Sequence, residues 1–348
     1  MSDNSIIVFS GHDVQELLAG RELALINLTR TAYQAHAAGA TSLPYSTFLH
    51  FPENPKARII GLPAYVGDQF KTAGIKWIAS FPDNLNCGMD RASAVIILNS
   101  IETGRPEAIL EGSVISAKRT AASAALAALT LQDGNAFDTI GMLGCGLISF
   151  EILRFLLAAC AEIKNVIAYD LSETQAEFFK KKCSVAFPQV DVSIATDVKT
   201  VLTNSRLISF ATSAAKPHIF DLSSCARGSL ILHISLRDLS PATLLAADNV
   251  VDDIDHVCRA ETSPHLAAQV SGTNDFIRCT LGEILIGQAP ARINPDSITI
   301  FSPFGLGILD LAVAQYVCKV HAEQEASSSS QYNSGFVLDS FLPRPWRE

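Results

Sequence analysis

A glycine turn between an apolar strand and an apolar helix constrains the fold of this chain more than any other feature. Residues 139–160 read TIGMLGCGLISFEILRFLLAAC. This order is typical of the strand–turn–helix that opens a dinucleotide-binding α/β domain. Gly144 allows the tight turn, and Gly146 lets the backbone approach a pyrophosphate at the helix N-terminus. Ser149 replaces the usual third glycine, and because serine is small we expect only a slight shift in packing.

An acidic residue ends the strand that follows this helix. Asp170 comes directly after the run NVIAY, close to the roughly 20-residue spacing at which an acid binds the adenosine ribose. A carboxylate there repels a 2′-phosphate, and no arginine occurs in residues 171–174, so the sequence favours NAD over NADP. The alternative is a glycine turn that binds no ligand, followed by a surface aspartate. The expected cofactor-binding residues of this region are Gly144, Cys145, Gly146, Leu147, Ile148, Asp170 and Thr212.

The order of predicted elements divides the chain into two parts. Strand-like runs before residue 113 follow one another without helices between them, which indicates an antiparallel sheet after two N-terminal helices at 10–20 and 21–38. An alanine-rich run without breakers predicts one helix over 113–131. Beyond residue 133, strands and helices alternate, as in a doubly wound parallel sheet.

Composition limits the classes of function. The chain has 348 residues, enough for two domains, with 48% hydrophobic residues and a net charge of -9, which argues against a general nucleic-acid binder. We expect no signal peptide and no membrane span, because no uncharged apolar run reaches the roughly 18 residues required. The eight cysteines form no CxxC pair, so we expect reduced thiols, a cytoplasmic location and no metal site. Cys145 is read as a small filler of the turn.

Four polar residues stand where apolar patterning would not place them. Lys76 interrupts the run AGIKWIAS, Arg119 and Thr120 lie in the alanine-rich helix, and Asp238 follows the strand SLILHIS. A buried cation needs an anionic partner, which a substrate carboxylate or a pyrophosphate can supply. Each residue also has an ordinary alternative. Lys76 would lie on a solvated strand face, Arg119 would extend to solvent, and Asp238 or Ser240 would cap the helix that follows.

Five sequence blocks carry a resemblance to a known family. GIKWIASFPDN, MDRASAVIILN, ILEGSVISAKRTAASAALAA, GMLGCGLIS and FGLGILDLAVA together resemble the ornithine cyclodeaminase/mu-crystallin family, over residues 5–322, and most closely its siderophore-pathway branch. The resemblance implies a Rossmann domain inserted into a discontinuous α+β domain for substrate binding and dimerisation. The expected domains are 1–132 plus 306–348 and 133–305, in a homodimer.

The resemblance also implies residue roles. Lys76 matches the lysine that binds the substrate α-carboxylate, Arg119 an arginine shared between carboxylate and cofactor, and Thr120 a neighbour of the pyrophosphate. Asp238 matches the catalytic aspartate, so Lys76 and Asp238 are the expected catalytic residues. Two cations on one carboxylate would orient the Cα–H for hydride transfer, and Asp238 would accept the amine proton and then activate water.

Departures from the family pattern concern the substrate. His50 stands where the cyclodeaminases carry a further arginine, and Gly61 where a glutamate holds the ornithine amine. The lysine that follows the family's aspartate is absent from RDLSPAT. The missing acid weakens a cyclodeaminase function.

The branch resembled oxidises N-(2-amino-2-carboxyethyl)-L-glutamate with NAD to 2-oxoglutarate and L-2,3-diaminopropionate, a precursor of siderophores and of peptide antibiotics. The alternatives are a cyclodeaminase-type lyase and a non-enzymatic NAD(P)H binder of the mu-crystallin kind. A substrate with several carboxylates needs further polar residues, and the candidates are Arg91, Arg58, His50, Asn84 and Ser93.

Overall fold

The computed structural model describes residues 6–132 and 136–327, and it divides into two compact units. The terminal unit comprises Met1–Arg119 and Leu306–Glu348, and the inserted unit comprises Thr120–Gly305. Helix α3, Ser113–Leu131, continues from the first into the second. The boundary predicted at residue 133 and the serine-rich tail after residue 327 lie outside the described residues. The roles predicted for the two domains stay predictions.

The terminal unit is built on a seven-stranded sheet in the order β1-β7-β6-β5-β4-β2, with β3 paired to β4. The β1–β7 pair is parallel and the other pairs are antiparallel, so the predicted antiparallel sheet is mixed at one edge. The strands are β1 Ile7–Phe9, β2 Thr41–Ser42, β3 Thr47–Phe51, β4 Asn54–Val66, β5 Thr72–Ser80, β6 Ala92–Asn99 and β7 Pro106–Glu111.

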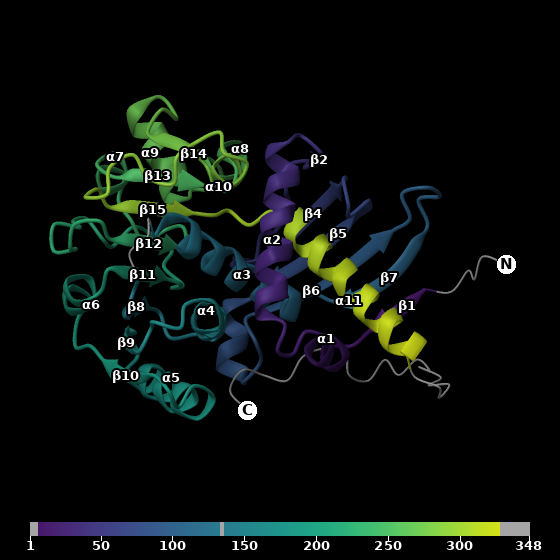
Figure 1. Cartoon of the computed structure of the whole chain (residues 1–348), viewed down its shortest axis with the longest axis horizontal. Helices are drawn as coiled ribbons and strands as arrows, with labels where there is room; N and C mark the ends of the chain where they lie inside the picture. Colours follow the sequence, from purple (N-terminus) through teal and green to yellow (C-terminus); the bar gives the residue numbers. More distant parts are fainter. Residues whose placement is uncertain (1–5, 133–135, 328–348) are drawn as a thin grey trace. The chain divides into compact units, whose positions relative to one another are not determined.

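One face of this sheet is covered by helix α11, Gly307–Ser327, which crosses β4, β5 and β6 (Figure 1). Helices α1, Gly11–Leu17, and α2, Glu22–Ala37, contact α11 as well. A 3₁₀ turn, Pro82–Cys87, links β5 to β6. The N- and C-terminal segments of the chain therefore form one unit, because the last helix packs on strands from the first third.

Strand pairing fixes which residues share the α11 face. Lys76 of β5 lies opposite Leu62 of β4 and Ile96 of β6, and all three are buried. Trp77, the next residue, points to the other face and is 41% exposed, since successive side chains of a strand alternate. Lys76 is therefore a residue of the covered face, and the solvated-face alternative for it is wrong.

The inserted unit contains an eight-stranded, wholly parallel sheet in the order β10-β9-β8-β11-β12-β15-β13-β14. The strand order reverses at β8, as in doubly wound folds that bind ligands at the carboxyl edge. The predicted fold class is thereby confirmed. The strands are β8 Thr139–Leu143, β9 Asn165–Tyr169, β10 Asp191–Ile194, β11 Leu207–Phe210, β12 Leu230–His233, β13 Asp248–Val251, β14 Ile277–Thr280 and β15 Thr299–Ser302.

The helices of the inserted unit connect consecutive strands (Figure 1). Strands β11, β12 and β15 form the centre of its core, with Ile208, Ile231 and Ile300 fully buried. A sheet buried on both faces explains the continuous apolar runs from which these strands were predicted. The helices are α4 Leu147–Ala159, α5 Glu173–Ala186, α6 Val198–Asn204, α7 Pro241–Leu245, α8 Ile254–Val257, α9 Ser263–Ser271 and α10 Leu281–Leu285.

Candidate active site

The terminal unit holds a buried ion triad formed by Lys76, Asp310 and Arg119. The Lys76 ammonium lies 2.6 Å from Asp310 Oδ2, and the Arg119 Nε lies 3.0 Å from Asp310 Oδ1. The side chains of Lys76 and Asp310 are 2% and 0% exposed, and that of Arg119 is 11% exposed. Ser116 Oγ, one helical turn before Arg119 on α3, accepts from both cations at 3.4 Å. The two cations therefore share a carboxylate of the protein, that of Asp310 on α11, and their binding of a substrate carboxylate stays a prediction.

The charges of the ion triad do not cancel. Two cations against one carboxylate leave one net positive charge, and a buried excess charge favours a further anion. Burial lowers the pKa of Lys76 to about 8, and the Arg119 charge adds to this effect, whereas the attraction of Asp310 opposes it. The triad is thus positive at neutral pH and loses its excess charge as the pH rises through about 8.

A second group of basic side chains, the basic cluster of His50, Arg58 and Arg91, lies along the same sheet. His50 of β3 pairs in register with Arg58 of β4, which pairs with Ser80 of β5. Arg91 Nε lies 3.3 Å from Ser80 Oγ. Ser80 is four residues from Lys76 on β5, about 13 Å along the strand, and an even spacing places both on the α11 face. Three of the predicted substrate residues are thus brought together at one end of that face.

Strand alternation separates other expected residues from Lys76. Ser93 pairs with Ala79 and therefore lies on the Trp77 face of the sheet. Lys76 lies on the opposite face, so the register does not support the substrate role predicted for Ser93. A Cβ at Gly61 would lie 3.3 Å from the Trp77 ring. An acid at position 61 would therefore not face Lys76, and its absence carries little weight against a cyclodeaminase. Asn84 donates to the Asp90 carbonyl at 3.2 Å and thus braces the loop before Arg91.

The glycine turn of the inserted unit has the geometry of a pyrophosphate cradle. Gly144 has φ +89°, and a Cβ there would lie 2.5 Å from the Ala211 carbonyl oxygen, so glycine is required. A Cβ at Gly146 would meet nothing within 4 Å, which leaves open space beside the first turn of the 13-residue helix α4. The backbone N–H groups of Leu147 and Ile148 begin this helix, whose N-terminus favours a phosphate.

Asp170 is fixed at the end of β9 by two backbone groups. Its Oδ2 accepts from Cys145 N at 2.8 Å, and its Oδ1 accepts from Ser172 N at 2.9 Å. Each carboxylate oxygen retains a second acceptor position, so the residue can still bind ribose hydroxyls. The open turn, the helix N-terminus and the oriented acid together fit a dinucleotide such as NAD.

Two further side chains tighten this turn. Ser149 is buried, and its hydroxyl donates to the Gly144 carbonyl oxygen, so the serine at the third glycine position braces the turn. Gln175 Nε2 donates to the Cys145 carbonyl at 2.7 Å. Burial, with Asp170 nearby, raises the pKa of the Cys145 thiol to about 12, and the thiol therefore stays protonated and unreactive at neutral pH.

Asp238 lies after the carboxyl end of β12, at the centre of what we call the Asp238 network, with Thr212, Ser235, His218 and His233. Oδ1 accepts from the Thr212 hydroxyl and lies 3.0 Å from His218 Nε2. Oδ2 accepts from the Ser235 hydroxyl and lies 3.4 Å from His233 Nε2. Thr212, expected at the cofactor, is thus a partner of Asp238.

The Asp238 carboxylate is strongly held in its ionised form. Burial alone would raise its pKa, but the neighbouring His233 ring and the hydroxyls of Ser235 and Thr212 outweigh burial and keep the pKa of Asp238 well below its usual range. Helix α7 is capped by Ser240, whose side chain accepts from Thr243 N. The alternative in which Asp238 serves only as a helix cap is therefore wrong.

Sequence reasoning missed Asp310 and His218. Asp310 is the one acid in the apolar run LGILDLAVA, and a lone carboxylate in such a run signals a buried ion pair. His218 lies in the loop AKPHIFDL, which has no periodicity, and only tertiary pairing brings it to Asp238. Thr120 follows Arg119 on α3 as the first residue of the inserted unit, and its role at the pyrophosphate stays a prediction.

The described residues offer neither a metal site nor a membrane-spanning helix. Within residues 6–132 and 136–327, no group of three or more His, Cys, Asp or Glu side chains is arranged to hold a metal ion. No helix in the same part of the chain has the length and apolar character needed to cross a membrane. The cytoplasmic location inferred from the sequence stays a prediction.

Comparison with known proteins agrees with this geometry. Residues 6–325 match the ornithine cyclodeaminase/mu-crystallin family, and the chain belongs to this family. The resemblance inferred from the sequence is confirmed. Among its relatives is the N-((2S)-2-amino-2-carboxyethyl)-L-glutamate dehydrogenase of Staphylococcus aureus, 28% identical over 333 residues that cover 94% of this chain and 98% of the relative.

Solved structures share the fold over almost the whole chain. The Δ1-pyrroline-2-carboxylate reductase of Thermococcus litoralis, in complex with NADH and L-proline, aligns with a TM-score of 0.85 at 22% identity, covering 92% of this chain and 98% of that one. An archaeal alanine dehydrogenase dimer with bound NAD aligns with a TM-score of 0.82 at 26% identity, covering 92% and 97%. These relatives are dehydrogenases and reductases of amino acids.

Proposed function

We propose that this chain is an NAD-dependent dehydrogenase that acts on the CH–NH bond of an amino acid with several carboxylates. The observation that carries the proposal is the excess positive charge of the ion triad, which needs an external carboxylate for balance. The substrate we propose is N-(2-amino-2-carboxyethyl)-L-glutamate, and the products are 2-oxoglutarate and L-2,3-diaminopropionate. The Staphylococcus aureus relative, named for this substrate, supports that choice.

The two units contribute different chemistry to this reaction. In the terminal unit, Lys76 and Arg119 bind the α-carboxylate, which orients the Cα–H bond. The basic cluster, about 13 Å along the strand from Lys76, suits the other carboxylates, because arginine side chains reach several ångströms inward. In the inserted unit, Gly144, Gly146 and Asp170 hold the cofactor.

The proposed reaction has two stages. NAD, when bound, supplies the hydride acceptor. As the Cα–H bond breaks with its electron pair, the amine N–H proton passes to the Asp238 network and a C=N bond forms. Water then adds to the imine carbon, both of its hydrogens end on the nitrogen, and the C–N bond breaks to leave a ketone and a primary amine.

A product assay tests this function. The protein is incubated with NAD and N-(2-amino-2-carboxyethyl)-L-glutamate, and NADH absorbance and product masses are followed. We expect one NADH for each 2-oxoglutarate and each L-2,3-diaminopropionate. With ornithine, ammonia release without net NADH would identify a cyclodeaminase instead. NAD(P)H binding without turnover of any amino acid would identify a binder of the mu-crystallin kind.

The cofactor preference is tested at Asp170. The Asp170→Ala substitution removes the carboxylate that repels a 2′-phosphate, so the ratio of NADH to NADPH affinity should fall towards one. Fluorescence titration with both cofactors measures this ratio. An unchanged ratio in a folded variant would contradict the ribose assignment.

We also propose that the chain forms a homodimer through the face of the terminal sheet opposite α11. This face presents exposed apolar side chains from neighbouring strands, among them Leu49, Tyr65 and Trp77, at 45%, 37% and 41% exposure. A contiguous apolar surface of this kind favours a protein partner, and the archaeal alanine dehydrogenase is a dimer. Light scattering should give twice the chain mass, and Trp77→Glu should give the monomer.

A further inference from the structure

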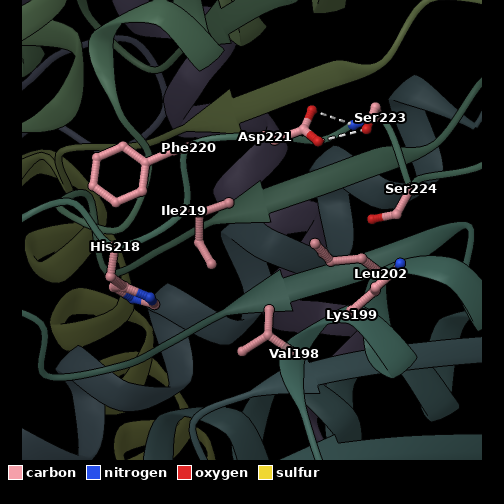
Figure 2. A pocket seen from close by; sticks show the side chains of 9 residues that line it. All are labelled: Val198, Lys199, Leu202, His218, Ile219, Phe220, Asp221, Ser223 and Ser224. Carbon is pink, nitrogen blue, oxygen red and sulfur yellow. Dashed lines mark hydrogen bonds between the residues drawn. The ribbon is translucent and has the colours of Figure 1, made fainter.

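His218 is the member of the Asp238 network that reaches a surface pocket. Its side chain is 42% exposed, whereas that of Asp238 is 0% exposed. The pocket is lined by residues of α6 and by His218–Asp221, Ser223 and Ser224, and Figure 2 shows the His218 ring at one end of it. The backbone of His218 is anchored as well, because its N–H donates to the Asp238 carbonyl at 2.9 Å. The ring is therefore held at a fixed place and still open to solution.

The Asp238 carboxylate, in contrast, has little capacity for a further partner. A carboxylate offers about four acceptor positions, and three side chains can donate to its two oxygens: Thr212 and His218 at Oδ1, and Ser235 at Oδ2. His233 Nε2 lies 3.4 Å from Oδ2 and accepts from the backbone N–H of Asp238 at 3.3 Å. The low pKa of Asp238 also makes it a poor acceptor for an amine proton. The arrangement is that of a carboxylate that orients an imidazole.

We propose that His218 is the proton-transfer group of the dehydrogenase reaction, with Asp238 as the carboxylate that orients its ring. This inference rests on the proposed function. Because an ionised carboxylate only accepts, His218 Nε2 carries the hydrogen shared with Asp238, and Nδ1 presents the free lone pair.

The proton balance follows from this tautomer. As hydride leaves the substrate Cα for NAD, Nδ1 takes the amine proton, giving an imidazolium beside the Asp238 carboxylate and a C=N bond in the substrate. The imidazolium returns this proton to the substrate nitrogen as water attacks the imine carbon. The ring then takes one proton of the added water and passes it to the departing amine. As the ketone forms, the ring takes the remaining hydroxyl proton and releases it to solution, so that His218 ends neutral and one proton is released for each NADH.

The other charged groups near His218 do not offer the same route. His233 also contacts Asp238, but its side chain is fully buried and its Nδ1 lies 3.1 Å from Ser302 Oγ. Lys199 of α6 and Asp221 line the same pocket with opposite charges. Asp221 accepts from Ser223 N at 2.8 Å. Among the described residues of the network, His218 is thus the titratable group with access to the pocket.

The His218→Gln substitution tests the inference, because glutamine can still donate to Asp238 but cannot carry a proton. We expect kcat to fall about 10²–10⁴-fold, with NADH affinity unchanged. The pH profile of kcat should differ from that of the wild type, because the side chain at position 218 no longer takes part in proton transfer. His12→Gln, at an exposed histidine of the terminal unit, is the matched control and should change nothing.

The outcomes separate the two proposals. An inactive wild-type protein with the proposed substrate would contradict the proposed function. An active wild type with an equally active His218→Gln variant and an unchanged pH profile would overturn the role of His218. If the variant fails to fold, a measurement on the wild-type protein that does not depend on activity still tests the role of His218. The ¹⁵N spectrum of His218 in the wild-type protein should show the Nε2–H tautomer, and the Nδ1–H tautomer would overturn the inference.

Discussion

Two buried aspartates, one in each unit, are held in opposite ways. Asp310 accepts from an ammonium and a guanidinium, so its surroundings carry more positive charge than it can balance. Asp238 accepts from two hydroxyls and lies against two imidazole rings, so its surroundings are built mainly of groups that share hydrogens. Both carboxylates are buried, yet only the first lies between a lysine and an arginine side chain.

This difference separates anion binding from proton transfer. With Lys76 protonated, the charges around Asp310 leave an excess positive charge that would attract a substrate carboxylate. The hydroxyls and rings around Asp238 fix the direction of each hydrogen, which proton transfer requires. In the proposed function the same residue type therefore serves two purposes, decided by its neighbours. Three experiments test this contrast, and a fourth tests the glycine turn.

The Asp238→Asn substitution should have the largest effect. An amide cannot accept all the hydrogens that the carboxylate receives, so the network loses its orientation. We expect turnover to fall about 10²–10⁴-fold, while NADH affinity, measured by fluorescence, stays within about twofold of the wild type. A folded variant that retains full turnover would remove Asp238 from the mechanism.

The Asp310→Asn substitution should act mainly on stability. It leaves two cations together in a buried site, and breaking a buried ion pair in this way costs about 3–5 kcal/mol. Chemical denaturation measures the loss. Asp296→Asn is the matched control, because Asp296 pairs with Arg227 at 3.4 Å on the surface, with both side chains largely exposed, and should cost less than about 1 kcal/mol. Equal losses would contradict the contrast.

The affinity for 2-oxoglutarate should fall as the pH rises through the pKa of Lys76, which burial lowers to about 8. Deprotonation of Lys76 takes the charge of the ion triad from positive to neutral, so Kd should rise by up to about tenfold per pH unit above that value. Calorimetry between pH 7 and 9.5 measures this, and 2-oxoglutarate has no group of its own that titrates there. A flat Kd would show that Lys76 does not bind the carboxylate.

The Ser149→Ala substitution should have the smallest effect. It removes the hydroxyl that donates to the Gly144 carbonyl, which should lower stability by about 0.5–1.5 kcal/mol. Ser184→Ala removes a similar bond to a backbone carbonyl, that of Lys181, at an exposed position, and should cost less than about 0.5 kcal/mol. If both variants behave alike, the serine does not brace the turn.

The sequence predicted those parts of the fold that local pattern determines. The alanine-rich run without breakers gave the helix bounds Ser113–Leu131 as observed. The parallel sheet followed from alternating elements, and the glycine turn from its spacing. The positions of Lys76 and Arg119 were notable because a charged residue in an apolar run is costly unless it is paired.

What the sequence did not predict depends on pairing between distant segments. Lys76 and Asp310 are 234 positions apart, so no local pattern joins them. Ser93 and Gly61 lie on the face opposite Lys76, because a one-residue step along a strand moves a side chain to the other face, and only the register shows which face holds Lys76. His218 required the bridge of Ile219 to Leu239, which brings its loop to Asp238.

The surplus positive charge beside Asp310 affects how the enzyme must be purified and assayed. The excess positive charge of the ion triad attracts any small carboxylate, so acetate or citrate from a purification buffer would compete with the proposed substrate. Apparent kinetic constants would then depend on the choice of buffer salt. Preparations kept in chloride with a zwitterionic buffer are the appropriate starting material.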